Sequence, residues 1–295
     1  MSFVADEISS QPDCWRRAAE LAAAPETVAA LPEHGARIAV VGCGTSLYMA
    51  QSFAALREAA GLGETDAFAA SEFPAGREYD HVVALTRSGT TTEVVRLLAA
   101  LPSGRRSTVI TTGTELPAAR EAGAVIVLDF ADEQSVVQTR FATTALALWR
   151  VSLSEDLSAV IADAEREAAA AAPDELASRQ QFTFLGTGWT VGLANEAALK
   201  CREAAQMWTE AYPAMEFRHG PVSVIGDASV VWFFGAPPAG LVDELSATGG
   251  AIVDEPGVDP MALLVRAQRL AVALAARKGL DPDAPRNLTR SIVLS

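Results

Sequence analysis

Short apolar runs, each followed by a glycine turn and an amphipathic segment, recur along the chain. The run "RIAVVGCGTSLYMAQSFAAL" predicts a buried strand at residues 38–41, then a glycine turn, then a helix with Thr45 or Ser46 as its N-cap. The same order returns 144 residues later in "QFTFLGTGWTVGLANEAALK", with a strand at residues 182–185. Two such units at half-chain spacing predict a duplicated α/β subdomain, each copy built on a mostly parallel sheet.

Further apolar runs extend this alternation. "HVVALTRSGTTTEVVRLLAAL" again predicts strand, polar turn and helix, and "STVITTG", "AVIVLDF" and "SVVWFFGA" predict further strands. Helical patterns cover residues 136–172 and 261–278, and "PDELASR" has the composition of a linker. We therefore expect an α/β, flavodoxin-like architecture of two subdomains, residues 1–172 and 173–295, with the tail "DPDAPRNLTRSIVLS" docked on the body of the protein.

Composition narrows the class of protein and partner. Half the residues are apolar and only 6% are aromatic, which favours helix-rich α/β packing. A net charge of -14 argues against nucleic acid or an anionic membrane as partner. Cys14, Cys43 and Cys201 form no CxxC pair, so neither a disulfide framework nor a zinc site is indicated. With no signal sequence and no apolar run near about 18 residues, we expect a soluble cytoplasmic protein.

Two polar turns have the composition of an anion site. "CGTS" at 43–46 and "TRSGTTTE" at 86–93 each follow a buried strand and precede a helix, so they belong at the carboxyl edge of a parallel sheet. Amides and hydroxyls at helix N-termini bind phosphate well. Taken singly, each turn is equally explained by helix capping, but the pair favours phosphate. A dinucleotide site is disfavoured, because "GCGTSL" lacks the third glycine of GxGxxG.

One predicted helix carries acid and base groups on one face. In "NEAALKCREAAQMW", Glu196, Lys200 and Glu203 are spaced i, i+4 and i+7. A solvated face with one ion pair of about 0.3–0.5 kcal/mol is the simpler explanation. Lysine is rare in this chain, however, with Lys278 the only other one. Carboxylates beside a lysine are also suited to moving protons next to a carbonyl.

The stretch "TEAYPAMEFRHGP", residues 209–221, carries too much charge for an ordinary interior. It lies between a helical run and an apolar strand, and it places His219 beside Arg218 before a rigid Gly-Pro turn. This chain has only three histidines, so the position of His219 calls for a functional explanation.

These motifs, together with "EQSVVQTRFATT" and "DPDAPRNLTRS", resemble successive signatures of the sugar isomerase (SIS) family. The similarity is to the isomerase half of glucosamine-6-phosphate synthase and to SIS-type glucosamine-6-phosphate deaminases. It implies two tandem SIS subdomains, a sugar phosphate as ligand, no cofactor and no metal. It also implies a homodimer in which His219 reaches the site from the partner subunit and assists ring opening.

The resemblance carries over residue by residue. Glu203 matches the base that moves a proton between C1 and C2, and Lys200 is a further catalytic candidate. The residues expected to bind phosphate and sugar are Cys43, Gly44, Thr45, Ser46, Thr86, Arg87, Ser88, Gly89, Thr91, Val136, Glu196 and Arg290.

Three departures from the family pattern bear on the reaction. The chain begins "MSFV" and enters the isomerase region almost at once, so we expect no use of glutamine. The family's QSG turn is RSG here, which leaves Arg87 either to add a guanidinium to the anion site or to cap its rim. The imine-forming lysine of the synthase matches Arg290, and arginine cannot form an imine because it stays protonated.

The leading hypothesis is proton transfer between C1 and C2 of a hexose or amino-hexose 6-phosphate. Deamination is favoured, because hydrolysis of the substrate's own ketimine needs no lysine; otherwise Lys200 has to supply the imine. Aldose–ketose isomerisation, a deglycase of a sugar-phosphate–amine adduct and a non-catalytic sugar-phosphate sensor remain alternatives.

Overall fold

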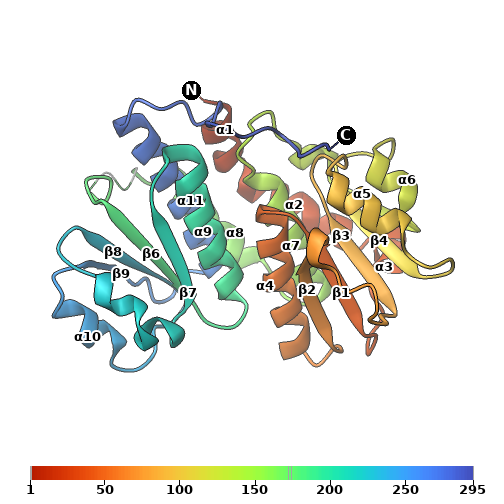
Figure 1. The fold of residues 1–295 in the computed structure, drawn as a ribbon, viewed down its shortest axis with the longest axis horizontal. Coiled ribbons are helices and arrows are strands. Elements are labelled where there is room, and N and C mark those ends of the chain that lie inside the picture. Colours follow the sequence, from red (N-terminus) through yellow and green to blue (C-terminus); the bar gives the residue numbers. More distant parts are fainter. Residues whose placement is uncertain (1, 172, 174, 295) are drawn as a thin grey trace. The chain divides into compact units, whose positions relative to one another are not determined.

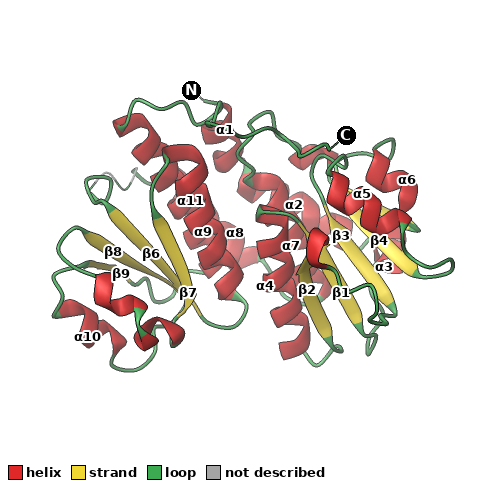
Figure 2. Ribbon diagram, in the orientation of Figure 1, coloured by secondary structure: helices red, strands yellow, loops and turns green. Residues whose placement is uncertain are grey.

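The computed structural model describes residues 2–171, 173 and 175–294. The chain forms two units, and each is built on one parallel sheet flanked by helices (Figures 1 and 2). Neither unit is a continuous piece of chain. Unit 1 consists of Met1–Ser9, Ser135–Val137 and Ser158–Leu288. Unit 2 consists of Ser10–Gln134, Gln138–Leu157 and Thr289–Ser295.

The sheet of unit 2 has the strand order β2-β1-β3-β4-β5, with every neighbouring pair parallel. Its strands are β1 (Ile38–Gly42), β2 (Thr65–Ala69), β3 (His81–Leu85), β4 (Arg106–Thr111) and β5 (Ala124–Val127). Its helices are α2 (Gln11–Ala22), α3 (Pro25–Ala30), α4 (Thr45–Ala59), α5 (Thr92–Ala99), α6 (Pro117–Glu121) and α7 (Arg140–Ser152), with short 3-10 turns η1 (Ala70–Glu72) and η2 (Asp129–Ala131).

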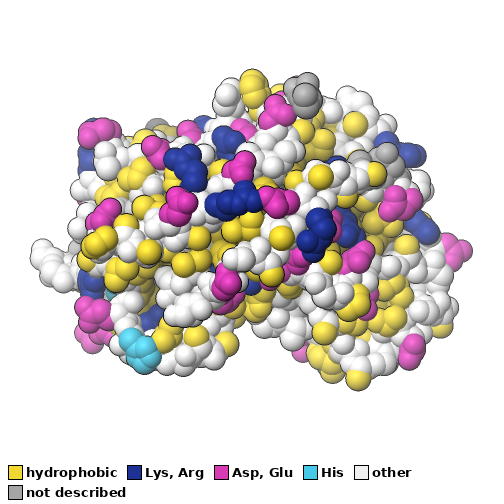
Figure 3. Space-filling model, turned by 180° about the vertical axis from the view of Figure 1, so that it is seen from behind, with side chains coloured by type: hydrophobic (Ala, Val, Ile, Leu, Met, Phe, Trp, Pro, Cys, Tyr) yellow, Lys and Arg dark blue, Asp and Glu magenta, His cyan; other side chains and the backbone are white. Residues whose placement is uncertain are grey.

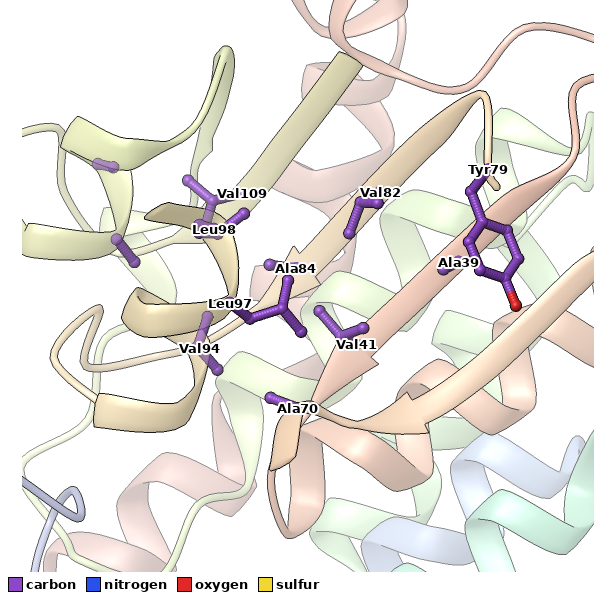
Figure 4. Packing of buried hydrophobic residues seen from close by; sticks show 12 residues of the cluster. Ala39, Val41, Ala70, Tyr79, Val82, Ala84, Val94, Leu97, Leu98 and Val109 are labelled. Carbon is purple, nitrogen blue, oxygen red and sulfur yellow. The ribbon is translucent and has the colours of Figure 1, made fainter. Parts of the chain in front are cut away.

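Both faces of this sheet are covered, which explains why its strands are almost continuously apolar. On one face, alternate residues of β1, β3 and β4 pack against α5 and α6, as Figure 4 shows for Val41, Ala84 and Leu97. Elsewhere in the unit, α4 packs on β1 and β2, and Phe53 of α4 stacks on Trp149 of α7 at 4.4 Å. The central strands β1 and β3 are therefore buried along their whole length.

The sheet of unit 1 has the order β7-β6-β8-β9 and is likewise parallel. Its strands are β6 (Gln181–Gly186), β7 (Thr209–Pro213), β8 (Ser229–Phe234) and β9 (Ala251–Val253). Its helices are α1 (Phe3–Ser9), α8 (Ser158–Ala169), α9 (Thr190–Ala205), α10 (Leu241–Ser246) and α11 (Pro260–Arg277), with 3-10 turns η3 (Glu216–His219) and η4 (Pro221–Val224).

Period-two alternation divides the core of unit 1 between the two faces of its sheet. Phe184, Trp232 and Phe234 form one aromatic layer. Leu185, Phe233 and their neighbours form the opposite layer, which includes residues of η3 and α10. Each face of β6 and β8 is thus lined by large buried side chains.

The structure confirms the expected α/β fold with two mostly parallel sheets. The units differ from the expected ranges 1–172 and 173–295, because α8 packs on α11 and belongs to unit 1. Arg266 of α11 binds the carboxylate of Glu167 in α8 through Nε and Nη2 at 2.6 and 2.7 Å. The helix expected over 136–172 is interrupted, because Ser154 adopts a positive φ of 70° between α7 and α8.

Equivalent glycines show the internal duplication in three dimensions. A Cβ on Gly42 would lie 2.6 Å from the backbone carbon of Ser46, and a Cβ on Gly186 would lie 2.4 Å from the backbone oxygen of Thr190. In both copies the helix therefore begins directly against the end of the strand, where no side chain fits. This close approach brings the helix N-terminus to the carboxyl edge of the sheet.

No helix in the described part of the chain is long and apolar enough to cross a membrane. On the face seen in Figure 3, acidic and basic side chains are interspersed rather than gathered by sign. A face of this kind offers no continuous basic surface for a polyanion.

His81, the first residue of β3, gives the fold a testable pH dependence. Its Nε2 lies 2.9 Å from Thr108 Oγ1, and its Nδ1 is buried with no hydrogen-bond partner among the described residues. Burial, and secondarily the charge of Arg106, lowers the pKa of His81 from 6.5 to about 4. The unfolded state therefore takes up a proton near pH 6.5 that the folded state refuses until about pH 4, so stability is lost as the pH falls through this window.

We predict that His81→Gln reduces the acid-dependent loss of stability between pH 7 and pH 5 by about 2 kcal/mol. Urea unfolding at the two pH values measures it. His34→Gln is the matched control, because it makes the same substitution at an exposed histidine. Equal acid sensitivity in the wild type and His81→Gln would contradict the assignment.

Candidate functional site

The turn between β1 and α4 offers hydroxyls and amides at a helix N-terminus. Gly44 adopts φ 56° and ψ −125°, a conformation suited to glycine, and the Ser46 amide closes the turn on the Cys43 carbonyl at 3.1 Å. Thr45 and Ser46 are buried, and Cys43 is half-buried. Burial, followed by the charge of Glu93, raises the pKa of the Cys43 thiol. The thiol is therefore not an activated nucleophile.

The turn between β3 and α5 is built around Gly89. Gly89 has φ 61°, and a Cβ there would lie 2.6 Å from Leu116 Cβ. Thr86 directly follows β3, and its amide donates to the Ile110 carbonyl of β4 at 3.1 Å. Beyond it, Ser88 Oγ lies 3.4 Å from Thr91 Oγ1. The turn thus places two hydroxyls side by side just before the N-terminus of α5.

The C-terminal tail docks on the same turn. Thr90 Oγ1 and Ser291 Oγ are 2.8 Å apart, and the Thr92 amide donates to the Ile292 carbonyl at 3.0 Å. The Leu294 amide in turn donates to Thr92 Oγ1 at 2.8 Å. The tail therefore caps the first amide of α5 and binds through Thr90 and Thr92, whereas Ser88 and Thr91 contact each other.

Arg87 is buried, with 4% of its side chain exposed, so it does not cap an outer rim. Its Nη1 lies 3.2 Å from Oε2 of Glu133, whose side chain is fully buried. The other oxygen of Glu133 accepts from the Thr139 amide, the Thr139 hydroxyl and the Arg140 amide at 2.5, 2.8 and 2.8 Å. Glu133 thereby caps the N-terminus of α7 and pairs with the phosphate-turn candidate Arg87.

Arg290 holds the other side of the same segment. Its guanidinium donates to the carbonyl of Glu133 and to the carboxylate of Asp132, and its own carbonyl lies 3.5 Å from Arg87 Nη2. The Arg290 side chain is thus engaged in positioning the loop before α7. Sequence reasoning missed Glu133 and Asp132, since acidic residues in a loop carry no signal of what they bind.

A second cluster lies on α9 in unit 1. Lys200 Nζ is 2.5 Å from Glu203 Oε2 and 3.4 Å from Glu196 Oε1. The side chains of Lys200 and Glu196 are each 1% exposed, whereas Glu203 is 20% exposed. The solvated surface pair considered from the sequence is therefore wrong, and Glu203 is the member of the cluster that solvent reaches.

His219 ends the short 3-10 turn η3 and is exposed. The turn is anchored by buried Phe217 and by Arg218, whose Nε and Nη2 contact the carboxylate of Glu244 at 3.1 and 2.9 Å. The charged stretch begins with regular structure, because Thr209–Pro213 forms the edge strand β7. Proline is tolerated there because an edge strand leaves one row of amides unused.

The structure brings together the predicted residues of each turn and, separately, those of α9. Val136 belongs to the short piece Ser135–Val137 that packs in unit 1, where Ser135 binds Glu7. The described residues contain no group of three His, Cys, Asp or Glu side chains able to hold a metal ion.

Comparison with known proteins finds similar sequences along most of the chain. The chain is 29% identical to the glutamine–fructose-6-phosphate aminotransferase (isomerizing) of Caulobacter vibrioides, over 99% of this chain and 59% of that protein. It is 27% identical to the enzyme of that name from Sulfolobus acidocaldarius, over 88% of this chain and 50% of that protein. The chain thus spans about half the length of these curated relatives. No protein-family model matches it.

Solved structures share the fold along the whole chain. Glucosamine-6-phosphate deaminase from Thermotoga maritima superposes with a TM-score of 0.82 at 24% identity, covering 99% of this chain and all of that one. The C-terminal domain of the aminotransferase from Francisella tularensis gives 0.79 at 19% identity, covering 97% of this chain and 98% of that one. Tagatose-6-phosphate ketose/aldose isomerase from Escherichia coli gives 0.78 at 18% identity, covering 100% and 96%.

Two α/β units, each built on one parallel sheet, give this chain the fold of solved phosphosugar isomerases and of a glucosamine-6-phosphate deaminase. Sequence and fold thus agree with the resemblance to the sugar isomerase (SIS) family.

Proposed function

We propose that this protein is an enzyme that moves a proton between C1 and C2 of an amino-hexose 6-phosphate and releases ammonia, as a glucosamine-6-phosphate deaminase does. The observation that carries the proposal is the α9 cluster, in which buried Lys200 orients the partly exposed carboxylate of Glu203 at 2.5 Å. A carboxylate held in one orientation, with an open side, is the equipment of a general base.

In the proposed reaction, Glu203 removes the C2 proton of the open-chain aldehyde and an enolamine forms. Return of the proton to C1 gives a ketimine on C2. Water then adds to this carbon, ammonia leaves, and the ketose remains. Glu203 ends the cycle as the carboxylate that began it, so no cofactor is consumed.

Arg290 and Lys200 favour deamination over reactions that need an enzyme-bound imine. Arg290 cannot form an imine, and its guanidinium is engaged with the loop at Asp132 and Glu133. Lys200 Nζ contacts the carboxylates of both Glu196 and Glu203, so its amine is already engaged. Hydrolysis of the substrate's own ketimine uses neither residue covalently, and it uses no glutamine.

The hydroxyls of Ser46, Thr86, Ser88 and Thr91, with the amides at the starts of α4 and α5, support binding of the substrate's phosphate in unit 2. Short polar side chains at helix N-termini are suited to a doubly charged anion. We place the reaction in the cytoplasm, because Cys14, Cys43 and Cys201 are all free thiols.

Aldose–ketose isomerisation is the second candidate, since it uses the same base on a hydroxyl substrate and the fold is shared with a tagatose-6-phosphate isomerase. A deglycase or a non-catalytic sensor lacks an observation of its own. Assaying ammonia and ketose together on hexose and hexosamine 6-phosphates separates these activities.

We also propose a homodimer in which His219 serves the partner's site. The segment that carries His219 exposes Trp208 by 83%, Met215 by 52% and Val224 by 55%. Large apolar side chains so exposed are unusual on a monomer and common at interfaces, where tryptophan is enriched. A second copy of the chain would cover them and give the exposed His219 a substrate to act on.

Glu203→Gln should reduce turnover by about 10²- to 10⁴-fold while leaving substrate binding intact, because it keeps the shape of the side chain and removes the base. The measurement is the initial rate on glucosamine 6-phosphate, repeated in deuterated water to follow label at C1. Glu165→Gln on the exposed surface of α8 is the control and should change the rate less than about twofold. Full activity of Glu203→Gln would remove Glu203 from the mechanism.

Inorganic phosphate and a hexose 6-phosphate should raise the melting temperature, whereas the unphosphorylated sugar should not. Binding only to the folded state stabilises it by about 2.7 kcal/mol at a hundredfold excess over Kd. Ser88→Ala should diminish the shift, and exposed Ser103→Ala should preserve it. Equal shifts with the phosphorylated and the free sugar would rule out the phosphate site.

His219→Ala and Glu203→Gln proteins, each inactive, should regain up to about a quarter of wild-type activity when mixed and allowed to exchange subunits. Half of the dimers are then mixed, and each has one site with both residues intact if His219 acts in trans. A mixture that stays inactive despite proven subunit exchange would contradict this arrangement.

A further inference from the structure

We propose that Arg87 is a positioning residue, which acts on the phosphate site through Glu133 rather than by touching the anion. This inference rests on the proposed phosphate site. The phosphate turn, the loop before α7 and the C-terminal tail would then form one clamp whose parts become ordered together.

The ion pair between Arg87 and Glu133 is buried. Arg87 and Glu133 are 4% and 0% exposed at their side chains, with 3.2 Å between Nη1 and Oε2. Removing one partner of a buried ion pair leaves the other charge without compensation, so a phosphate that drew Arg87 away would isolate Glu133. The guanidinium therefore stays with Glu133 when the site fills.

Glu133 binds both the start of α7 and the C-terminal tail. Its Oε1 accepts from both the amide and the hydroxyl of Thr139 and from the Arg140 amide, which fixes the start of α7. Arg290 binds the carbonyl of the same residue from the tail. One glutamate thus connects the β3–α5 turn, through Arg87, with α7 and with the tail.

The hydroxyl residues of the β3–α5 turn fall into two sets, one that binds the tail and one that we assign to the anion. Thr90 and Thr92 bind the tail through Ser291, Ile292 and Leu294. Ser88 and Thr91, the hydroxyls assigned to the anion, contact each other. Because the two sets are distinct, tail and anion do not compete for hydroxyls, and ordering the turn from the tail side prepares it for the anion. By linkage, binding of the anion must then also stabilise the docking of the tail on this turn.

A direct contact between Arg87 and the phosphate would predict the opposite effect of Glu133→Gln on phosphate affinity. If Arg87 were an anion ligand, Glu133→Gln would release the guanidinium, remove a negative charge and tighten binding. If Arg87 works through Glu133, the same substitution weakens binding. Glu133→Gln is nearly isosteric, and its amide oxygen still accepts from Thr139 and Arg140, so the cap of α7 survives.

The first experiment titrates inorganic phosphate into the full chain by calorimetry. We expect Arg87→Gln and Glu133→Gln each to raise Kd about fivefold or more, and the double variant to be no worse than either, since all three break the same link. Arg120→Gln is the matched control, because Arg120 forms an exposed pair with Glu115 on unit 2. An unchanged or lower Kd for Glu133→Gln would overturn the proposal.

The second experiment measures hydrogen exchange in the peptide covering residues 289–294, without ligand for every protein and also with phosphate for the wild type. Arg87→Gln and Glu133→Gln should both accelerate exchange there by about tenfold, and phosphate should slow it in the wild type. A tail that exchanges as in the wild type in both variants would overturn the clamp even if the protein bound no phosphate. Absence of phosphate binding by the wild type would instead reject the proposed function.

Ser291→Ala keeps the proposal testable if both pair variants fail to fold. It removes one hydrogen bond at the edge of the turn and leaves the buried pair intact. We expect faster tail exchange together with a Kd for phosphate about two- to threefold higher. Faster exchange with an unchanged Kd would show that tail and anion are independent, against the proposal.

Discussion

The close approach of helix to strand at Gly42 and Gly186 is the constraint on which the rest of the structure depends. A helix that starts against the last residue of a strand leaves no room for a Cβ, as the distances of 2.6 and 2.4 Å to the following backbone show. It also fixes where the first amides of the helix lie. Hydroxyl residues placed in the same few positions then stand at an edge of the sheet where backbone donors already gather. Loop chemistry in this protein follows from strand–helix geometry.

Much of this geometry was predictable from the sequence because it rests on local patterns. Buried parallel strands read as apolar runs, and glycine marks the turns, so β1, β3, β6 and β8 were predicted within a residue or two. The strands β2, β7 and β9 were missed because edge strands are half-buried and their patterns are weak. β7 in particular contains Glu210 and ends in Pro213, and both residue types are rare in strands.

The candidate site was predictable in its residue types but not in its partnerships. The i, i+4, i+7 spacing placed Glu196, Lys200 and Glu203 together, and helix geometry alone guaranteed that much. That Lys200 is buried depends on the packing of α9 against β6 and α11, which no local pattern reveals. Arg87 is a clearer case, since its partner Glu133 is 46 residues away and the pair is invisible until the sheet assembles.

The two equivalent turns, after Gly42 and after Gly186, use their hydroxyl residues differently. In unit 1, Thr190 occupies the place of Ser46, and its hydroxyl donates to the Phe234 carbonyl at 2.6 Å, so it serves as a scaffold atom. Ser46 lies in the first turn of α4, in the copy whose hydroxyls we assign to a ligand. A saturating survey of substitutions would therefore separate the copies by phenotype. Changes at Thr190 should appear as lost protein abundance, and changes at Ser46 as normal abundance with lost activity. The two copies thus share their backbone geometry at these turns, whereas substitutions at equivalent positions would affect stability in one copy and activity in the other.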